Sequence, residues 1–186
     1  MTAMIHASKL PPLPPDRLLI RPGSDGAVRT DPERSGWRYL SFQARSLEDG
    51  EAVMLPASDL EAAVVTIAGG GVEIEIDDAP RIALRGRPSV FEGMPWTAYL
   101  PAGTAARIVG RPLPNRRAVV AIAQAPSSGR DGVAREPIVV GPDEVEIEIR
   151  GAGNATRQVN NIIMPAFPAD RLLICEVFTP NGSWSG

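Results

Sequence analysis

Histidine, cysteine and lysine each occur only once in this chain of 186 residues, as His6, Cys175 and Lys9. One histidine is too few for a histidine-based metal site or a catalytic triad within the chain. One cysteine excludes an internal disulfide framework and fits a reducing compartment, so we expect a cytoplasmic protein. These scarcities argue against secreted disulfide-rich folds and against a self-contained zinc enzyme.

Long hydrophobic runs and blocks of like charge are also absent. No apolar run reaches the roughly 20 residues that a membrane helix needs, and no apolar segment follows a basic N-terminus as in a secretory signal. The net charge is −3 and the basic residues form no block, so we expect neither a nucleic-acid nor a membrane partner. Hydrophobic residues make up 44% of the chain, which is enough for a buried core.

Turn residues, in contrast, are abundant, because 19 prolines and 18 glycines separate short apolar segments. No segment shows convincing 3.6-residue periodicity, so a β-rich fold is expected. Residues 37–46 and 72–77 alternate as half-buried strands do, and the apolar run 62–68 is typical of a strand buried on both faces. The segment 69–71, Gly-Gly-Gly, is interpreted as a hairpin turn, because a phosphate-binding loop would need a helix after it.

Further short strands complete the expected all-β fold, an antiparallel barrel or sandwich. We expect them at 18–21, 81–84, 89–91, 97–100, 105–109, 118–123, 145–150, 157–163 and 172–178. The expected organisation is an N-terminal arm at 1–17, a barrel at 18–125, a linker at 126–144 and a second set of strands at 145–186. The second set has too few strands to close another barrel, so we expect it to pair with the first domain or with another chain.

The spacing within the predicted barrel is similar to the first cupin motif when that motif starts at Gly50 and closes at Gly69. The four positions that hold metal ligands in cupins are then occupied by Pro56, Ser58, Ala62 and Ala106. Pro and Ala cannot bind a metal through their side chains, and Ser is not a cupin ligand. The resemblance therefore implies a cupin barrel, a jelly-roll-like double-stranded β-helix, with an apolar interior and without metal ligands.

Two C-terminal segments are similar to the 5-deoxy-glucuronate isomerase family of inositol catabolism. They read Gly-Ala-Gly-Asn-Ala-Thr-Arg-Gln-Val-Asn-Asn-Ile at 151–162 and Glu-Val-Phe-Thr-Pro-Asn-Gly-Ser-Trp-Ser at 176–185. Gly-Trp at 36–37 and Ser-Val-Phe-Glu-Gly at 89–93 also resemble that family. The resemblance runs from about residue 18 onward and implies a bicupin, represented here by its first barrel and the opening strands of an incomplete second barrel.

This resemblance implies an aldose–ketose isomerase, an intramolecular oxidoreductase that converts the sugar acid 5-deoxy-glucuronate to 5-dehydro-2-deoxy-gluconate. It also implies a divalent metal, zinc or manganese, held in the full-length family member by a Pro-Pro-His-Lys-His stretch that follows the segment ending at Gly186. We therefore expect no metal and no activity in this chain alone, and a homo-oligomer is a further expectation. The alternative is a non-catalytic, metal-free cupin that binds a ligand or scaffolds an assembly.

Four residues are candidates for a role in the site. Arg157 could bind the substrate carboxylate through its guanidinium, although an exposed or structurally paired arginine is the alternative. Asn160 and Asn161 could bind sugar hydroxyls or cap a strand end. Glu176 lies in the apolar stretch 172–178, where burial would raise its pKa and suit it to proton transfer, unless it faces solvent.

Overall fold

The computed structural model describes residues 19–185. The expected N-terminal arm at 1–17, with His6, lies outside the described residues. The prediction of an all-β protein is confirmed, because strands dominate and the helical segments are single turns. These turns are α2 (Pro32–Ser35), η1 (Pro142–Glu144) and η2 (Gly153–Ala155). Within the described residues no helix is long and apolar enough to cross a membrane.

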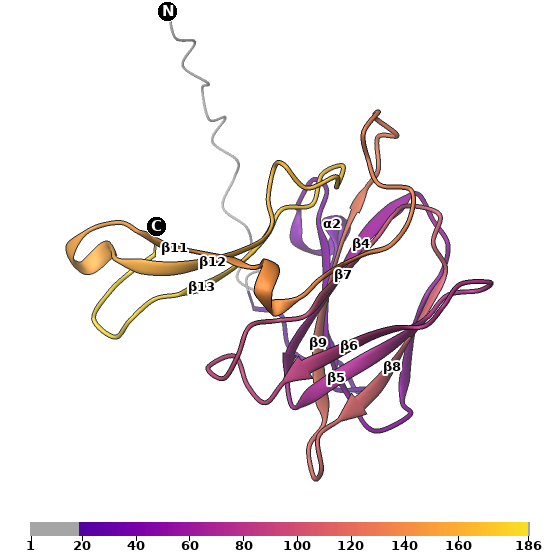
Figure 1. Ribbon diagram of the computed structural model, residues 1–186, viewed down its shortest axis with the longest axis horizontal. Helices are drawn as coiled ribbons and strands as arrows, with labels where there is room; N and C mark the ends of the chain where they lie inside the picture. The colour runs from indigo at the N-terminus through magenta and orange to yellow at the C-terminus, as the bar shows by residue number, and fades with distance from the viewer. Residues whose placement is uncertain (1–18, 186) are drawn as a thin grey trace, which may run out of the picture.

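Two antiparallel sheets form the barrel (Figure 1). The first has six strands, in the order β1 (Val28–Thr30), β2 (Ser41–Leu47), β9 (Ala118–Pro126), β4 (Leu60–Ala68), β7 (Thr97–Leu100) and β10 (Ile138–Val140). The second has four, in the order β3 (Ala52–Leu55), β8 (Ala106–Pro112), β5 (Gly70–Glu75) and β6 (Ile82–Arg87). The core lies between them, with Val64 and Ile122 facing Ile74 and Ile108, all without solvent exposure.

A third antiparallel sheet, of β11 (Glu146–Arg150), β12 (Arg157–Ile163) and β13 (Ile174–Phe178), projects from one side of the barrel (Figure 1). Its strands pair with one another in sequence order. Within residues 19–185 they form no strand pair with the first domain, and pairing with another chain stays a prediction. They reach the barrel by side-chain packing instead, because Ile162, Ile163 and Leu172 form one apolar cluster with the outer face of the six-stranded sheet.

Several expected boundaries differ from the structure near the sheet edges. Residues 19–21 form no strand, whereas β1 lies within 23–36, which carries the turn signals of a loop. Residues 89–91 contain only an isolated bridge between Ser89 and Glu92. The range 126–144, expected as a linker, contains β10, which pairs with β7. The edge strands β1 and β10 have only three residues each. Their pairing partners, rather than their own periodicity, therefore decide where they form.

The glycine triplet at 69–71 is not a hairpin turn, because β4 and β5 belong to different sheets. It is a corner at which the chain leaves the six-stranded sheet for the four-stranded one. A Cβ atom on Gly71 would lie 1.9 Å from the carbonyl oxygen of Leu84, and one on Gly70 would lie 2.6 Å from the amide nitrogen of Leu113. Glycine is required here because neighbouring backbones pass too close for any side chain.

Candidate functional site

The interior of the barrel carries no chemistry-bearing side chains at the cupin ligand positions. Ala62 and Ala106 are buried in the apolar core, and Pro56 is exposed on the loop before β4. Among residues 19–185 no three His, Cys, Asp or Glu side chains gather closely enough to hold a metal ion. A catalytic zinc site has three protein ligands. The described residues therefore do not fit a catalytic zinc ion.

Glu61 connects the barrel to the segment that leads into β13 of the third sheet. It lies on β4 with no solvent exposure, and its carboxylate accepts hydrogen bonds from three successive backbone amides, those of Asp170, Arg171 and Leu172, at 2.8, 2.6 and 2.8 Å. The hydroxyl of Tyr99 donates a fourth, at 2.8 Å. Burial, together with this bond and the nearby negative charge, raises the pKa of Tyr99 well above its ordinary value. The segment before β13 is thereby fixed against the six-stranded sheet.

Asp170 extends this connection toward the segment after β9. Its carboxylate accepts hydrogen bonds from the hydroxyls of Ser127 and Ser128, at 2.9 and 2.8 Å, and pairs with Nε of Arg130 at 3.3 Å. Burial alone would raise the pKa of Asp170, but these bonds and the arginine charge outweigh it, so that the pKa lies below its ordinary value of 3.8. Asp170 is therefore held as a carboxylate between two segments that flank the third sheet.

A second connection joins β6 to β13 through Arg87 and Glu176. The Arg87 side chain is only 2% exposed, and its guanidinium donates to both carboxylate oxygens of Glu176. The remaining Arg87 donors reach the carbonyl oxygens of Ile67 and Gly93, each at 3.1 Å. Every charged or polar atom of this buried pair thus has a partner, the condition under which a buried ion pair is tolerated.

A pocket of about 310 Å³ lies beside this ion pair. One wall is apolar, with Phe91 and Phe178 at a ring-centroid separation of 6.3 Å. The other wall is polar, because Gln158 donates to Asn160 at 2.8 Å and Asn160 donates to Glu176 at 3.2 Å. Amide groups next to an apolar surface are the combination that binds the hydroxyls and the C–H faces of a small polar ligand.

The structure brings two of the four predicted site residues together. Asn160 and Glu176 are directly opposite each other in the β12–β13 register. Because side chains alternate along a strand, Arg157 and Asn161 belong to the other face of β12. There the Arg157 guanidinium donates to the carbonyl oxygen of Ala155 at 3.1 Å, and the Asn161 amide donates to Glu148 at 3.4 Å. Neither of them lines the pocket.

Sequence reasoning missed three residues of this region. Gln158 could have been found by alternation, since it is two residues from Asn160 on the same strand. Glu61 could have been noticed as a lone acid at the start of an apolar strand. No sequence pattern pointed to Arg87, because its partner Glu176 is 89 residues away in the sequence.

Comparisons with known proteins agree on one family. The model of the KduI/IolB family matches residues 18–186. A 5-deoxy-glucuronate isomerase from Geobacillus kaustophilus strain HTA426 is 36% identical over 175 residues, which are 91% of this chain and 60% of that protein. One from Geobacillus thermodenitrificans strain NG80-2 is 34% identical over 167 residues, covering 88% of this chain and 57% of that protein. The chain thus spans about 60% of the length of these curated relatives.

Two solved structures have a similar fold. The crystal structure of an IolB-like protein from Salmonella typhimurium LT2 is similar, with a TM-score of 0.76 and 28% identity over 89% of this chain and 60% of that one. A putative glyoxylate-induced protein from Pseudomonas aeruginosa shares the fold alone, at a TM-score of 0.54 and 12% identity over 75% of this chain and 49% of that one.

Proposed function

Because the chain belongs to the KduI/IolB family, we propose that it is part of a 5-deoxy-glucuronate isomerase of myo-inositol catabolism, a bicupin that converts this aldehyde sugar acid to 5-dehydro-2-deoxy-gluconate. The observation that carries the proposal is the likeness, over 91% of this chain, to a relative named for this activity. The cytoplasm, a small sugar-acid substrate and a homo-oligomeric assembly belong to the same proposal.

The pocket beside Arg87 and Glu176 supports a role in holding the substrate. Asn160 and Gln158 offer amide groups for sugar hydroxyls, and Phe91 and Phe178 offer an apolar surface for the carbon skeleton. An aldose–ketose isomerisation moves a proton between adjacent carbons, which requires a base close to that proton. In this proposal Glu176 is that base. One of its carboxylate oxygens gives up its hydrogen bond to Arg87 when the substrate binds.

The reaction also needs an electrophile for the developing enediolate oxygen, and in this family we propose a divalent metal, zinc or manganese, for that role. The described residues do not supply its ligands. Arg157 and Asn161 lie on the other face of β12, outside the pocket, and this proposal gives them no contact with the substrate.

The second candidate function, a metal-free scaffold, is favoured for the first barrel by its apolar interior. Ala62 and Ala106 stand in the core where cupin ligands would be. The two functions are compatible in one protein, because the barrel can support the third sheet through Glu61 while that sheet carries the substrate pocket.

The two asparagines on opposite faces of β12 provide a matched test in the complete gene product. Conversion of 5-deoxy-glucuronate is followed by NMR. Asn160→Ala is expected to lower kcat/KM by about tenfold or more, as the loss of one hydrogen bond in a polar pocket would. Asn161→Ala is the control and should change kcat/KM less than about threefold. Equal losses in both variants would contradict the proposed pocket, and an inactive wild-type protein would contradict the proposed activity.

A further inference from the structure

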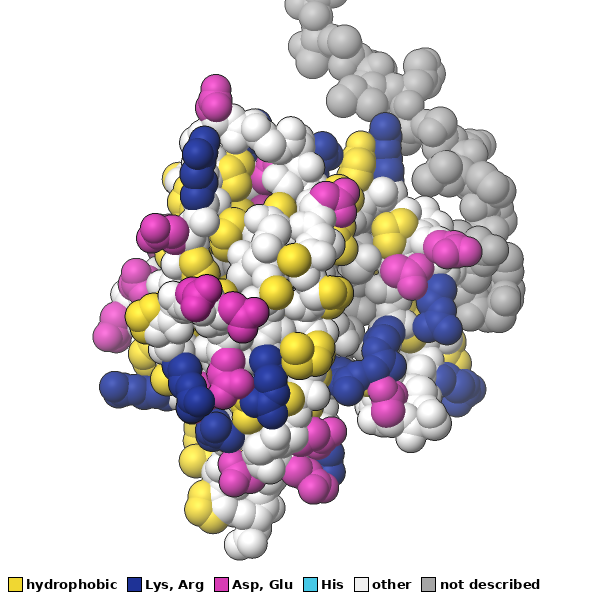
Figure 2. All heavy atoms as spheres, turned by 90° about the vertical axis from the view of Figure 1, so that its right-hand side faces the viewer, with side chains coloured by type: hydrophobic (Ala, Val, Ile, Leu, Met, Phe, Trp, Pro, Cys, Tyr) yellow, Lys and Arg dark blue, Asp and Glu magenta, His cyan; other side chains and the backbone are white. Residues whose placement is uncertain are grey.

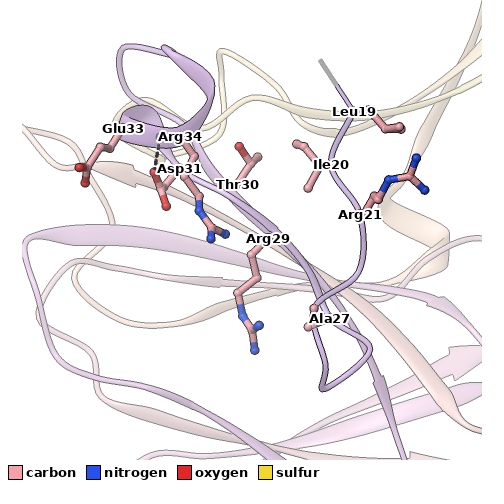
Figure 3. A pocket seen from close by; sticks show the side chains of 10 residues that line it. Leu19, Ile20, Arg21, Ala27, Arg29, Thr30, Asp31, Glu33 and Arg34 are labelled. Atoms are coloured by element: carbon pink, nitrogen blue, oxygen red, sulfur yellow. Dashed lines mark hydrogen bonds between the residues drawn. The ribbon is translucent and has the colours of Figure 1, made fainter. Parts of the chain in front are cut away.

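A second and larger pocket, of about 800 Å³, lies between the segment 19–21 and the strand β1 with its following turn α2 (Figure 3). Figure 3 shows Ile20 facing Thr30 across it, while the Arg34 side chain descends from α2 toward Arg29. Its size falls in the range of about 300–1,000 Å³ that is usual for small-molecule sites. None of the residues that line it also lines the pocket beside Glu176.

Thr30 is the first sign that this pocket is built for a ligand. The residue is only 4% exposed, and its hydroxyl oxygen has no hydrogen-bond partner among the described residues. A buried hydroxyl without a hydrogen-bond partner destabilises the folded state. A valine of the same shape would avoid that cost, so the hydroxyl indicates a partner that enters from the pocket.

The charges around the pocket give the second sign. Arg29 is already neutralised, since its guanidinium binds Asp25. Arg34, in contrast, forms no salt bridge with any residue in 19–185, and its side chain points into the pocket, whereas that of Arg21 points away from it (Figure 3). Asp31 uses one carboxylate oxygen to accept the backbone amide of Arg34 at 2.8 Å, which leaves its other oxygen as an acceptor.

We propose that this pocket binds a small hydroxylated anion, either a sugar acid or a sugar phosphate. The guanidinium group of Arg34 matches a carboxylate or a phosphate. The hydroxyl of Thr30 and the free oxygen of Asp31 exchange hydrogen bonds with ligand hydroxyls, and Ile20 lies against the apolar face of the sugar ring. This inference goes beyond the proposed isomerase, because it concerns binding at a separate pocket.

The test measures the ligand-induced shift in melting temperature and the Kd by calorimetry, with glucuronate, glucose 6-phosphate and glucose as probes. At least one of the two anions should bind saturably and raise the melting temperature, whereas glucose should do neither. The lower Kd of the two identifies the carboxylate or the phosphate as the preferred group. Binding of glucose as tight as that of both anions, or no binding at all, would overturn the proposal.

Variants locate the binding. Thr30→Val removes only the hydroxyl, and we expect it to raise the melting temperature of the free protein and to weaken anion binding by about tenfold. Thr30→Ser should keep most of the affinity. Arg34→Gln should weaken binding by about tenfold or more, while Arg135→Gln, an exposed arginine outside the pocket, should not. Asn160→Ala should leave this binding intact. A ligand-induced shift in melting temperature that persists in both Thr30→Val and Arg34→Gln would contradict the proposal.

Discussion

At the scale of single residues, Glu61 and Glu176 are acids with different kinds of partner. Glu61 is satisfied by backbone amides and a tyrosine hydroxyl, and Glu176 by a buried guanidinium. Both partner sets come from segments far away in the sequence. The chemistry of Glu176 and Asn160 could be suggested from residue type, but their contacts could not, because Arg87 and the β12–β13 register are products of the fold.

Glu176→Gln should destabilise the protein by about 3 kcal/mol, measured by denaturant unfolding. The change leaves the buried Arg87 without its counter-charge, and breaking a buried pair from one side costs about 3–5 kcal/mol. We expect the lower end because the Glu176 side chain is 18% exposed. Glu148→Gln is the control, since Glu148 pairs with Arg150 at the surface, and it should change stability little. Similar losses in both variants would contradict a structural role for the Arg87–Glu176 pair.

Asp170 predicts a pH dependence with a defined sign. Its pKa in the folded state lies below the ordinary value of 3.8, so its ionised form stabilises the fold. That contribution is fully present at neutral pH and is lost as the pH falls below 3.8 through the folded-state pKa. The stability difference between wild type and Asp170→Asn should therefore be constant near neutrality and shrink at acid pH. A constant difference for Asp170→Asn down to the acid limit would refute this assignment.

At the scale of elements, alternation predicts strands where one face is buried by a partner sheet. Val72 and Ile74 of β5 face the core as expected, while Glu73 and Glu75 pair with arginines of neighbouring strands. Alternation does not tell which sheet a strand joins. The sequence around Gly71 therefore predicts a hairpin where the structure has a corner, since glycine serves both in tight turns and where backbones approach closely.

The docking of the third sheet through Glu61 leads to a prediction about hydrogen exchange. Glu61→Gln replaces one accepting oxygen by an amide nitrogen that cannot accept, so the backbone amides of 170–172 lose at least one partner. We expect them to exchange about tenfold faster, with amides of β5 and β8 unchanged. Tyr99→Phe is the matched control, because it removes the hydroxyl bond and leaves the three amide bonds. Equal protection of 170–172 in Glu61→Gln and wild type would show that Glu61 does not hold this segment.

At the scale of the whole molecule, charge gathers on the surface of the barrel while the interior is apolar. Arg, Asp and Glu side chains are interspersed across the face that Figure 2 displays. Several of them form ion pairs across the four-stranded sheet, among them Arg81–Glu73, Arg107–Glu75 and Arg111–Glu73. Such exposed pairs contribute little to stability, so the barrel is held mainly by its apolar core. Composition and turn spacing were sufficient to predict that architecture.

The arrangement of barrel and third sheet could not be derived from composition. It depends on the Glu61 and Arg87 connections, and on an apolar cluster that joins Tyr99 of β7 to Ile163 of β12. The two C-terminal segments that resemble the isomerase family most, 151–162 and 176–185, belong to the third sheet and its flanking turns. The same sheet contributes Gln158, Asn160 and Phe178 to the pocket, and Glu176 is hydrogen-bonded to Asn160.

The central claim is tested most directly by a side-by-side assay of residues 1–186 and of the complete gene product with 5-deoxy-glucuronate, each with added zinc or manganese. We predict isomerisation by the complete product and no measurable turnover by residues 1–186. Loss of an electrophile typically lowers rates by about a hundredfold to a thousandfold, and the described residues contain no group that could hold a metal. Comparable turnover by the two proteins, or none by the complete product, would contradict this account.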